Sequence, residues 1–277
     1  MSANAYNSRG VVFLHIGKDD QAIEDFNKAI SIDPKLSTAY SNRGIVYKNK
    51  GQLDRAMEDY NSAINLSPTE FPAYVNRGKL YWMKKQYDRS IEDSNKAISL
   101  NPNIPEAYHN RGIAKDMKGQ QDQAIEDFTK AISLNPNFAP AYHSRGIAYA
   151  KKGQIDRAIE DYTRAISLNP NLAPFYVSRS EAYLVKRYYD QVINDCNNAI
   201  SLDPNSAGCY FGRGAASFGK KQYERAIEDF DKAISIDPKF SMAYYLRGCA
   251  YQIKGQLGRA QDDLRKACDL GFKGACR

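Results

Sequence analysis

The sequence lacks the short motifs that mark the common catalytic and nucleotide-binding sites. It contains no HExxH, no GxSxG, no Walker loop and no GxGxxG that follows a predicted strand. Histidine is scarce, and although we expect His109 and His143 to face the same surface, no third ligand accompanies them. We therefore expect no metal site and no cofactor, and we expect that the protein is not an enzyme.

Cysteine is also rare, and it is confined to the last third of the chain. The five cysteines are Cys196, Cys209, Cys249, Cys268 and Cys276. Their odd number and the absence of a CxxC spacing argue against a zinc site and against a disulfide framework. We interpret Cys196 and Cys268 as small buried side chains, and Cys276 as a candidate reactive thiol.

Long apolar segments are missing too. No run of about 18 apolar residues is present, so the sequence predicts no membrane span. The first residues, MSANAYNSRG, carry no apolar signal segment. We expect a cytoplasmic protein, or one from which a targeting segment was removed before this numbering begins.

The sequence does contain a strict period of 34 residues. Arginine keeps this period at Arg9, Arg43, Arg77, Arg111, Arg145, Arg179, Arg213 and Arg247. Tyrosine keeps it at Tyr6, Tyr40, Tyr74, Tyr108, Tyr142, Tyr176, Tyr210 and Tyr244. Such a period indicates one supersecondary unit stacked in tandem. We predict a single array over residues 3–274, with eight repeats at about 4–37, 38–71, 72–105, 106–139, 140–173, 174–207, 208–241 and 242–275.

Each repeat reads as two amphipathic helices. Tyr6, Gly10 and Phe13 fall on one face of a first helix, and a second apolar face follows between Gly17 and Pro34. Neither helix is stable alone, so each must bury its face against neighbours. A glycine in mid-helix costs about 1 kcal/mol relative to alanine, so its recurrence at the Gly10 position indicates that two helices nearly touch there.

These tyrosine, glycine, aromatic and alanine rows resemble the tetratricopeptide repeat over essentially the whole chain. The resemblance implies an all-α fold, a right-handed α-solenoid (superhelix) of antiparallel helix pairs. First helices would line a concave groove, and second helices would form the back. The chain departs from the family at Lys115 and Ser217, which replace the second aromatic, and we expect looser packing there.

An aspartate row follows the arginine row. Its members are Asp25, Asp59, Asp93, Asp127, Asp161, Asp195, Asp229 and Asp263. Because Arg9 and Asp25 flank the buried stripes of their helices on equivalent sides, we predict a ladder of structural ion pairs, within repeats or between them. Loss of one partner of a buried pair costs about 3–5 kcal/mol. The alternative is a basic groove for phosphate, which the aspartates disfavour.

Lysine ends most of the first helices, and the net charge is +7. The row is Lys50, Lys84, Lys118, Lys152, Lys186, Lys220 and Lys254. A lysine in this position complements the helix dipole and can bond the last carbonyls. The alternative is a basic surface that binds nucleic acid or another anionic partner; we favour the structural role.

The outward positions of the first helices vary more than the buried rows, which is typical of a recognition surface. Asn42, Asn76 and Asn110 resemble part of the asparagine ladder in the repeat superhelix of O-linked N-acetylglucosamine transferase. A carboxamide both donates and accepts hydrogen bonds, so it can hold a peptide unit. The alternative is that these are ordinary solvent-facing residues. The other predicted partner-binding residues are Lys79, Trp82, His109, His143, Phe211, Phe218 and Tyr245.

We therefore predict a non-enzymatic scaffold that binds a peptide or protein segment in the concave groove. The alternatives are the basic surface described above and a substrate-docking region of a longer enzyme. The aromatic groove residues of the last repeats have a further alternative, partial burial as the superhelix curls. Leu264, Ala267 and Leu270 would lie open on the last helix, because the chain from Gly271 is too short for a capping helix. We expect that end to be covered by self-association or by further chain.

Overall fold

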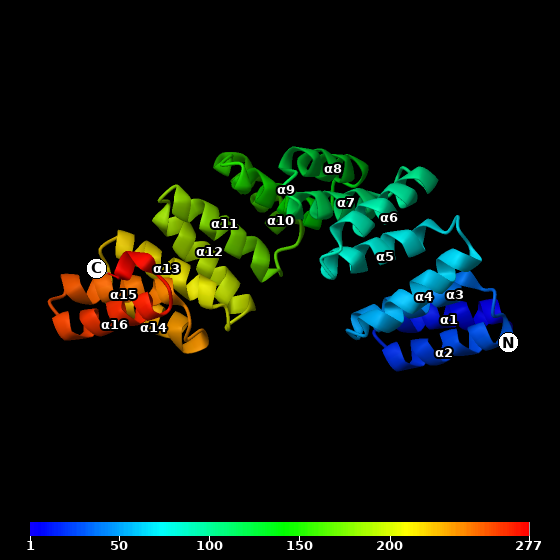
Figure 1. The fold of residues 1–277 in the computed structure, drawn as a ribbon, viewed down its shortest axis with the longest axis horizontal. Helices are drawn as coiled ribbons and strands as arrows, with labels where there is room; N and C mark the ends of the chain where they lie inside the picture. The colour runs from blue at the N-terminus through cyan, green and yellow to red at the C-terminus, as the bar shows by residue number, and fades with distance from the viewer. Residues whose placement is uncertain (277) are drawn as a thin grey trace. The chain divides into compact units, whose positions relative to one another are not determined.

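The structure, a computed structural model that describes residues 1–276, contains sixteen α-helices, one short 3-10 helix and no strand within those residues. Two compact units are present, Met1–Ala141 (unit 1) and the part from Tyr142 onward (unit 2). Unit 1 contains α1 (Ala3–His15), α2 (Asp19–Ile32), α3 (Ser37–Asn49), α4 (Leu53–Leu66), α5 (Phe71–Met83), α6 (Tyr87–Leu100), α7 (Pro105–Met117) and α8 (Gln121–Leu134) (Figure 1). Helix α9 (Ala139–Lys151) crosses the boundary between the units. Unit 2 continues with α10 (Ile155–Leu168), α11 (Ala173–Val185), α12 (Tyr189–Leu202), α13 (Ala207–Gly219), α14 (Tyr223–Ile236), α15 (Ser241–Ile253), α16 (Leu257–Asp269) and the 3-10 helix η1 (Lys273–Ala275).

A tight turn joins the two helices of each repeat and makes them antiparallel. In the first repeat, Lys18 N donates to Phe13 O (2.9 Å) and Gly17 N donates to Leu14 O (3.2 Å), which satisfies carbonyls at the helix end. Gly17 adopts φ 72°, a region that favours glycine. The third, sixth and seventh repeats place Lys85, Arg187 and Lys221 at this position, also with positive φ.

Glycine in mid-helix brings the two helices of a repeat into contact, as the sequence predicts. A Cβ atom at Gly112 would lie 2.6 Å from Cε1 of Phe128, a distance that real Cβ atoms do not reach. The same contact recurs at Gly10, Gly44, Gly146 and Gly214. In the sixth repeat the second-helix aromatic is replaced by the buried Cys196, and Ser180 stands where the other repeats have glycine. The smaller sulfur side chain leaves room for the Cβ of Ser180.

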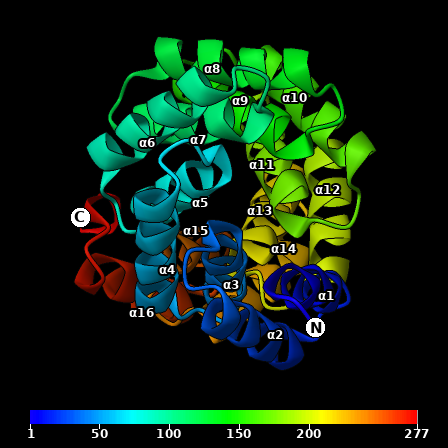
Figure 2. The same cartoon turned by 90° about the vertical axis from the view of Figure 1, so that its right-hand side faces the viewer.

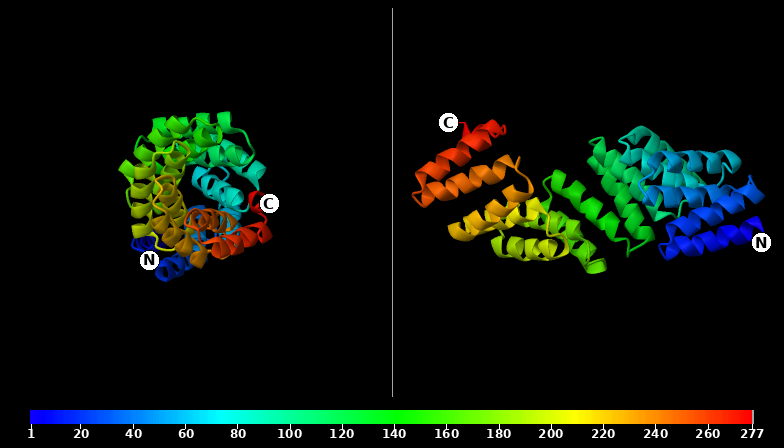
Figure 3. Two further views of the ribbon diagram at one scale, coloured as in Figure 1. Left: turned by 90° about the vertical axis from the view of Figure 1, so that its left-hand side faces the viewer. Right: turned by 90° about the horizontal axis from the view of Figure 1, so that it is seen from below.

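The helices form two layers in each unit. First helices contact one another directly: α3 contacts α5 and α5 contacts α7 in unit 1, and α11, α13 and α15 do the same in unit 2. Figure 2 shows α5 and α7 on the inner side of α6 and α8, and Figure 3 shows the successive pairs of unit 2 in yellow-green to red. The predicted all-α class with tandem helix pairs is confirmed. The single array over residues 3–274 stays a prediction.

The predicted ion-pair ladder is present in both units. Arg77 Nε and Nη2 each donate to one carboxylate oxygen of Asp93 at 2.8 Å, which is a two-point fork. The third donor, Nη1, reaches Asn61 Oδ1 of the preceding repeat at 2.8 Å. The structure thus answers the question that the sequence left open, because the ion pairs form within repeats. Six of the arginines also donate to the repeat before them: Arg43, Arg77, Arg111, Arg179, Arg213 and Arg247. The same fork joins Arg9–Asp25, Arg43–Asp59, Arg111–Asp127, Arg145–Asp161, Arg179–Asp195, Arg213–Asp229 and Arg247–Asp263.

Burial and ion pairing shift the pKa of the ladder carboxylates in opposite directions. The hydrogen bond from Arg9 lowers the pKa of Asp25. At Asp59 and Asp93 burial outweighs the arginine partners and raises the pKa. A buried ion pair is therefore weak evidence for net stabilisation, although removal of one partner alone leaves a costly unpaired charge.

The two departures from the second aromatic row differ in structure. Lys115 Nζ lies 2.8 Å from Asp127 Oδ2, so its ammonium group joins the ladder. Ser217 is buried, with 3% of its surface exposed, and it lines a pocket of about 230 Å³. The looser packing expected from the sequence is thus found at Ser217, whereas Lys115 compensates with an ion pair.

Candidate protein-interaction surface

The first-helix layer of unit 1 carries most of the predicted partner-binding residues. Asn42 lies on α3, Asn76, Lys79 and Trp82 lie on α5, and Asn110 lies on α7 with His109. These helices contact one another, and we call the surface of this first-helix layer the inner surface of unit 1.

Two of the three predicted asparagine clasps are bonded within the protein. Asn110 is 4% exposed, and its Nδ2 donates to the backbone carbonyl oxygen of Val75 at 3.0 Å. The prediction that Asn110 presents a free carboxamide to a partner is therefore wrong, because its amide links α7 to α5. Asn42 Nδ2 donates to Asn7 Oδ1 at 3.1 Å. Only Asn76 makes no side-chain hydrogen bond within residues 1–276.

Lys48 on α3 and Lys79 on α5, from neighbouring repeats, lie near enough for their charges to interact. Burial is the main cause that lowers the pKa of Lys48, and the charge of Lys79 lowers it further. Lys48 is half-buried and Lys79 is exposed. Neither has a carboxylate partner in the part of the chain that the structure describes. The sequence interpretation named Lys79 and missed Lys48, although its position one repeat before Trp82 would have pointed to it.

Trp82 is half-buried rather than fully exposed. Its indole Nε1 is covered and has no hydrogen-bond partner among the described residues. The adjacent Met83 is 43% exposed. The inner surface of unit 1 thus joins an apolar area to the pair of lysines.

Both predicted histidines are packed against aromatic rings. The ring of His109 lies 5.2 Å from that of Phe138 and 5.7 Å from that of Phe128, measured between centroids. In unit 2, His143 lies 4.8 Å from Phe175 and its Nε2 is 2.9 Å from Ser178 Oγ. Burial lowers the pKa of His143 to about 4. These rings act as packing elements, and no cluster of three or more metal-ligating side chains occurs among the residues described.

The predicted aromatic residues of unit 2 also pack against neighbouring rings. The ring of Phe211 lies tilted against that of Phe240 at 4.8 Å between centroids, and Phe218 meets Tyr223 edge-on at 5.5 Å. Tyr245 lies 4.6 Å from the ring of Phe272, which belongs to the C-terminal segment. All three predicted residues are half-buried. Partial burial, the alternative given by the sequence, therefore fits these residues better than an exposed apolar contact for a partner.

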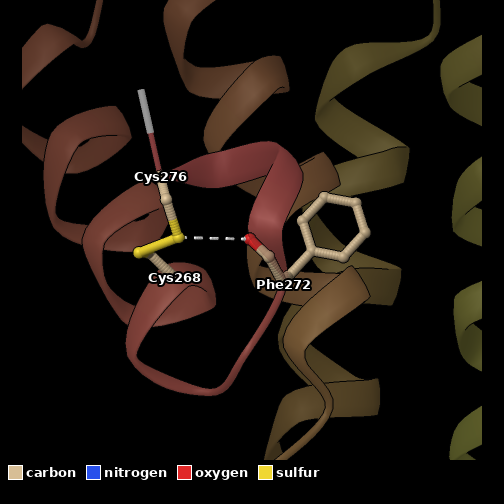
Figure 4. The surroundings of a disulfide bond; sticks show 3 residues. All are labelled: Cys268, Phe272 and Cys276. Atoms are coloured by element: carbon tan, nitrogen blue, oxygen red, sulfur yellow. Dashed lines mark hydrogen bonds between the residues drawn. A yellow bond between two sulfur atoms is a disulfide. The ribbon is translucent and has the colours of Figure 1, made fainter.

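The C-terminal segment corrects two sequence predictions. Cys268 and Cys276 form a disulfide, so Cys268 is not a simple buried side chain and Cys276 is not a free thiol (Figure 4). The bond holds η1 against the end of α16, with Cys276 Sγ 3.7 Å from the Phe272 carbonyl oxygen. The segment from Gly271 is thus long enough to fold back over part of the last repeat. Cys196 is fully buried, as predicted.

The lysine row has partners that the sequence interpretation missed. Lys50 Nζ lies 2.8 Å from Asp20 Oδ1, and Lys84 Nζ lies 2.5 Å from Asp54 Oδ1. Each acid stands in the first turn of the second helix of the preceding repeat, which also suits that helix dipole. Equivalent pairs are Lys118–Asp88, Lys186–Asp156, Lys220–Asp190 and Lys254–Glu224. The matching period of the acids is the signal that could have revealed them.

The chain is a helical-repeat protein of the protein-interaction class. This class is defined by stacked helix pairs, a regular spacing of buried rows and a variable inner surface. Models described as Tetratricopeptide repeat match residues 71–104, 95–126, 139–172, 207–240 and 230–262, and a model described as TPR repeat matches 12–51, 46–85 and 117–153. The chain belongs to the tetratricopeptide repeat family, and its fold is that of a protein-interaction scaffold. A search of curated proteins gives no match to this chain.

Solved structures agree with the family. The MamA protein is 30% identical, with a TM-score of 0.50, over 61% of this chain and 92% of that one. The Cut9 and Hcn1 APC/C hetero-tetramer gives a TM-score of 0.72 at 17% identity, over 94% of this chain and 53% of that one. This chain therefore spans about half the length of that structure. A Pseudomonas aeruginosa protein, pilF, gives 0.66 at 21% identity, over 75% of this chain and 94% of that one. The last two likenesses show the fold alone.

None of the helices in the described part of the chain combines the length and the apolar character needed to cross a bilayer. The cytoplasmic compartment stays a prediction.

Proposed function

We propose that this protein is a non-enzymatic scaffold that holds a segment of a partner polypeptide against the inner surface of unit 1. The observation that carries the proposal is the pair of adjacent lysines, Lys48 and Lys79, for which residues 1–276 supply no carboxylate. A like charge disfavours the charged form of its neighbour, and burial does the same. An acidic side chain of a partner placed between the two ammonium groups would offset both effects, because an opposite charge favours the charged form.

The residues next to the lysines specify the rest of the partner segment. Asn76 offers an amide NH2 group that can donate and a carbonyl oxygen that can accept, which suit a peptide bond of any sequence. Trp82 and Met83 offer a half-exposed apolar area, and aromatic residues of this kind are frequent binding hot spots. We therefore expect a segment with an acidic residue a few positions from a large apolar residue.

Two observations argue against the alternative of a nucleic-acid surface. Lysines such as Lys50 are already paired with acids of the preceding repeat. The ladder arginines are forked onto aspartates. Sequence-independent affinity for nucleic acid needs several cations that are free to contact phosphates, and these rows supply few.

The test is a pull-down from native lysate, followed by peptide mapping of the retained partner and measurement of its dissociation constant. We expect Lys79→Glu combined with Trp82→Ala to weaken binding by about 30-fold or more, as for a hot spot worth about 2 kcal/mol. Lys96→Glu is the matched control, because Lys96 is exposed on α6 of the same repeat and carries the same charge change. Unchanged binding by the double variant, with loss in the control, would place recognition on the second helices instead.

A further inference from the structure

Four repeats enclose a tyrosine ring between two arginines. In the second repeat, the guanidinium carbons of Arg43 and Arg55 lie 5.8 Å and 5.6 Å from the centroid of Tyr47. The same trio recurs as Arg77, Arg89 and Tyr81, as Arg145, Arg157 and Tyr149, and as Arg247, Arg259 and Tyr251. Guanidinium groups at this range are attracted to the face of an aromatic ring. The tyrosine is therefore held by charge as well as by packing.

The seventh repeat keeps both arginines and lacks the ring. Arg213 and Arg225 stand at the two arginine positions, and Ser217 stands at the tyrosine position. These three residues line a pocket of about 230 Å³ between α12, α13 and α14, together with Ile193, Gln222, Glu228 and Asp229. The fourth repeat also lacks the tyrosine, but it replaces the second arginine by Gln123 and pairs Lys115 with Asp127. The combination of two arginines without a ring thus distinguishes the seventh repeat.

We propose that this pocket receives a tyrosine side chain from a partner polypeptide. The pocket occupies the position that a tyrosine ring fills in four other repeats of the same chain, and it keeps the two arginines that flank that ring. Its volume exceeds that of engineered apolar cavities of about 150 Å³ that hold benzene. The guanidinium carbon of Arg213 lies 5.4 Å from the ring centroid of Tyr210. A ring that enters the pocket would lie against Arg213 as Tyr47 lies against Arg43.

The charges around the pocket favour a neutral ring. Asp229 neutralises Arg213 through the ladder fork, and Glu228 places a second carboxylate in the lining. A phosphorylated tyrosine would bring its negative charges toward both carboxylates, whereas an unmodified phenol ring carries no charge for them to repel. The pocket lies in unit 2 and shares no residue with the inner surface of unit 1, so it is a second and independent site.

The experiment follows backbone amide signals of the whole protein by NMR while N-acetyl-L-tyrosinamide is added. We expect shifts centred on Ser217 and Arg213, with a dissociation constant on the order of millimolar for so small a probe. N-acetyl-L-leucinamide should bind about tenfold more weakly, since it lacks the ring that the arginines attract. Equal binding of the two probes, or tighter binding of N-acetyl-O-phosphotyrosinamide, would overturn the proposal.

Two variants provide the decisive comparison. Ser217→Tyr supplies the ring from within, and it should abolish the shifts while raising the melting temperature, which also shows that the variant is folded. Tyr149→Ser opens the equivalent pocket between Arg145 and Arg157, and it should add a second set of shifts in the fifth repeat. Persistence of the shifts at Arg213 in Ser217→Tyr would refute the site, and neither result bears on the partner of unit 1.

Discussion

The contact between Gly112 and Phe128 illustrates how a single residue sets the distance between two helices. The ring of Phe128 is 1% exposed and has no room to move away from α7. The third repeat differs, because Ser94 stands at the aromatic position. A Cβ atom on Gly78 would lie 3.4 Å from Asp93 Cβ and 3.5 Å from Ser94 Oγ, which are ordinary contacts. The glycine is therefore required by packing in the fourth repeat and not in the third.

We predict opposite results for the same substitution at these two glycines. Gly112→Ala should destabilise the protein by about 1–3 kcal/mol, because the new methyl group overlaps the ring. Gly78→Ala should be neutral or stabilising by up to about 1 kcal/mol, because alanine has the higher helix propensity. Chemical denaturation of both variants measures the difference. Equal destabilisation by both substitutions would show that the ring contact is not the cause.

The pKa of His143 also depends on the residues that surround it. It is packed against Tyr162 and Phe175, and burial lowers its pKa to about 4 from an ordinary value of about 6.5. Because the fold favours the neutral ring, the stabilisation is complete above about pH 6.5 and is lost as the pH falls toward 4.

We therefore predict that the free energy of unfolding of the wild type falls more steeply between about pH 6.5 and 4 than that of His143→Phe. Phenylalanine is the residue that this chain itself uses at the equivalent position, Phe211. Urea titrations across this range give the two curves, and the ladder aspartates contribute equally to both. Parallel curves would mean that His143 is free to protonate in the folded protein.

At the scale of an element, the C-terminal segment depends on the link between α16 and η1. The disulfide closes a loop with a sequence separation of 8, and Phe272 covers the ring of Tyr245 on α15. Without the link, few other contacts oppose the loss of η1, which is exposed and only three residues long.

We predict that Cys276→Ser lowers the local stability of the last repeat by up to about 2 kcal/mol, the order expected for closure of a short loop. Hydrogen exchange in α15 and α16 should become faster, and Tyr245 should become more accessible. Reduction of the wild type should have the same effect, and it should not affect Cys276→Ser further. Identical exchange in oxidised wild type and variant would contradict the prediction.

At the scale of the whole molecule, ion pairs between repeats account for much of the charge. Lysines such as Lys50 join a first helix to the preceding second helix, and the third donor of arginines such as Arg77 also reaches the preceding second helix. In a repeat protein, stability is approximately a sum of repeat terms and of terms between neighbours. These pairs contribute to the terms between neighbouring repeats, so the stability that they add accumulates along each unit.

The last repeat has no following neighbour in the described chain, and its outer face is only partly covered. Leu264 remains half-buried beside a hollow of about 550 Å³ lined by Gln261, Arg265 and the two bonded cysteines. For the alternative in which self-association covers this face, we predict that Leu264→Glu shifts the protein to a smaller species in sedimentation velocity. Gln123→Glu, on the exposed side of α8, is the control for added charge. A wild type that sediments as a monomer at high concentration would exclude this role.

The sequence by itself determined the helix pairs, the glycine contacts and the presence of an arginine–aspartate ladder, whereas the structure decided that its pairs form within repeats. A strict period fixes which side chains share one face of a helix, and buried faces in neighbouring helices must then meet. Only the tertiary structure decided that Asn110 bonds to Val75, that Lys50 reaches Asp20, that Cys268 joins Cys276 and that Ser217 lines a pocket between Arg213 and Arg225. The physical reason is that periodicity gives the direction of a side chain from its own helix, whereas its partner depends on distances across the interface between helices.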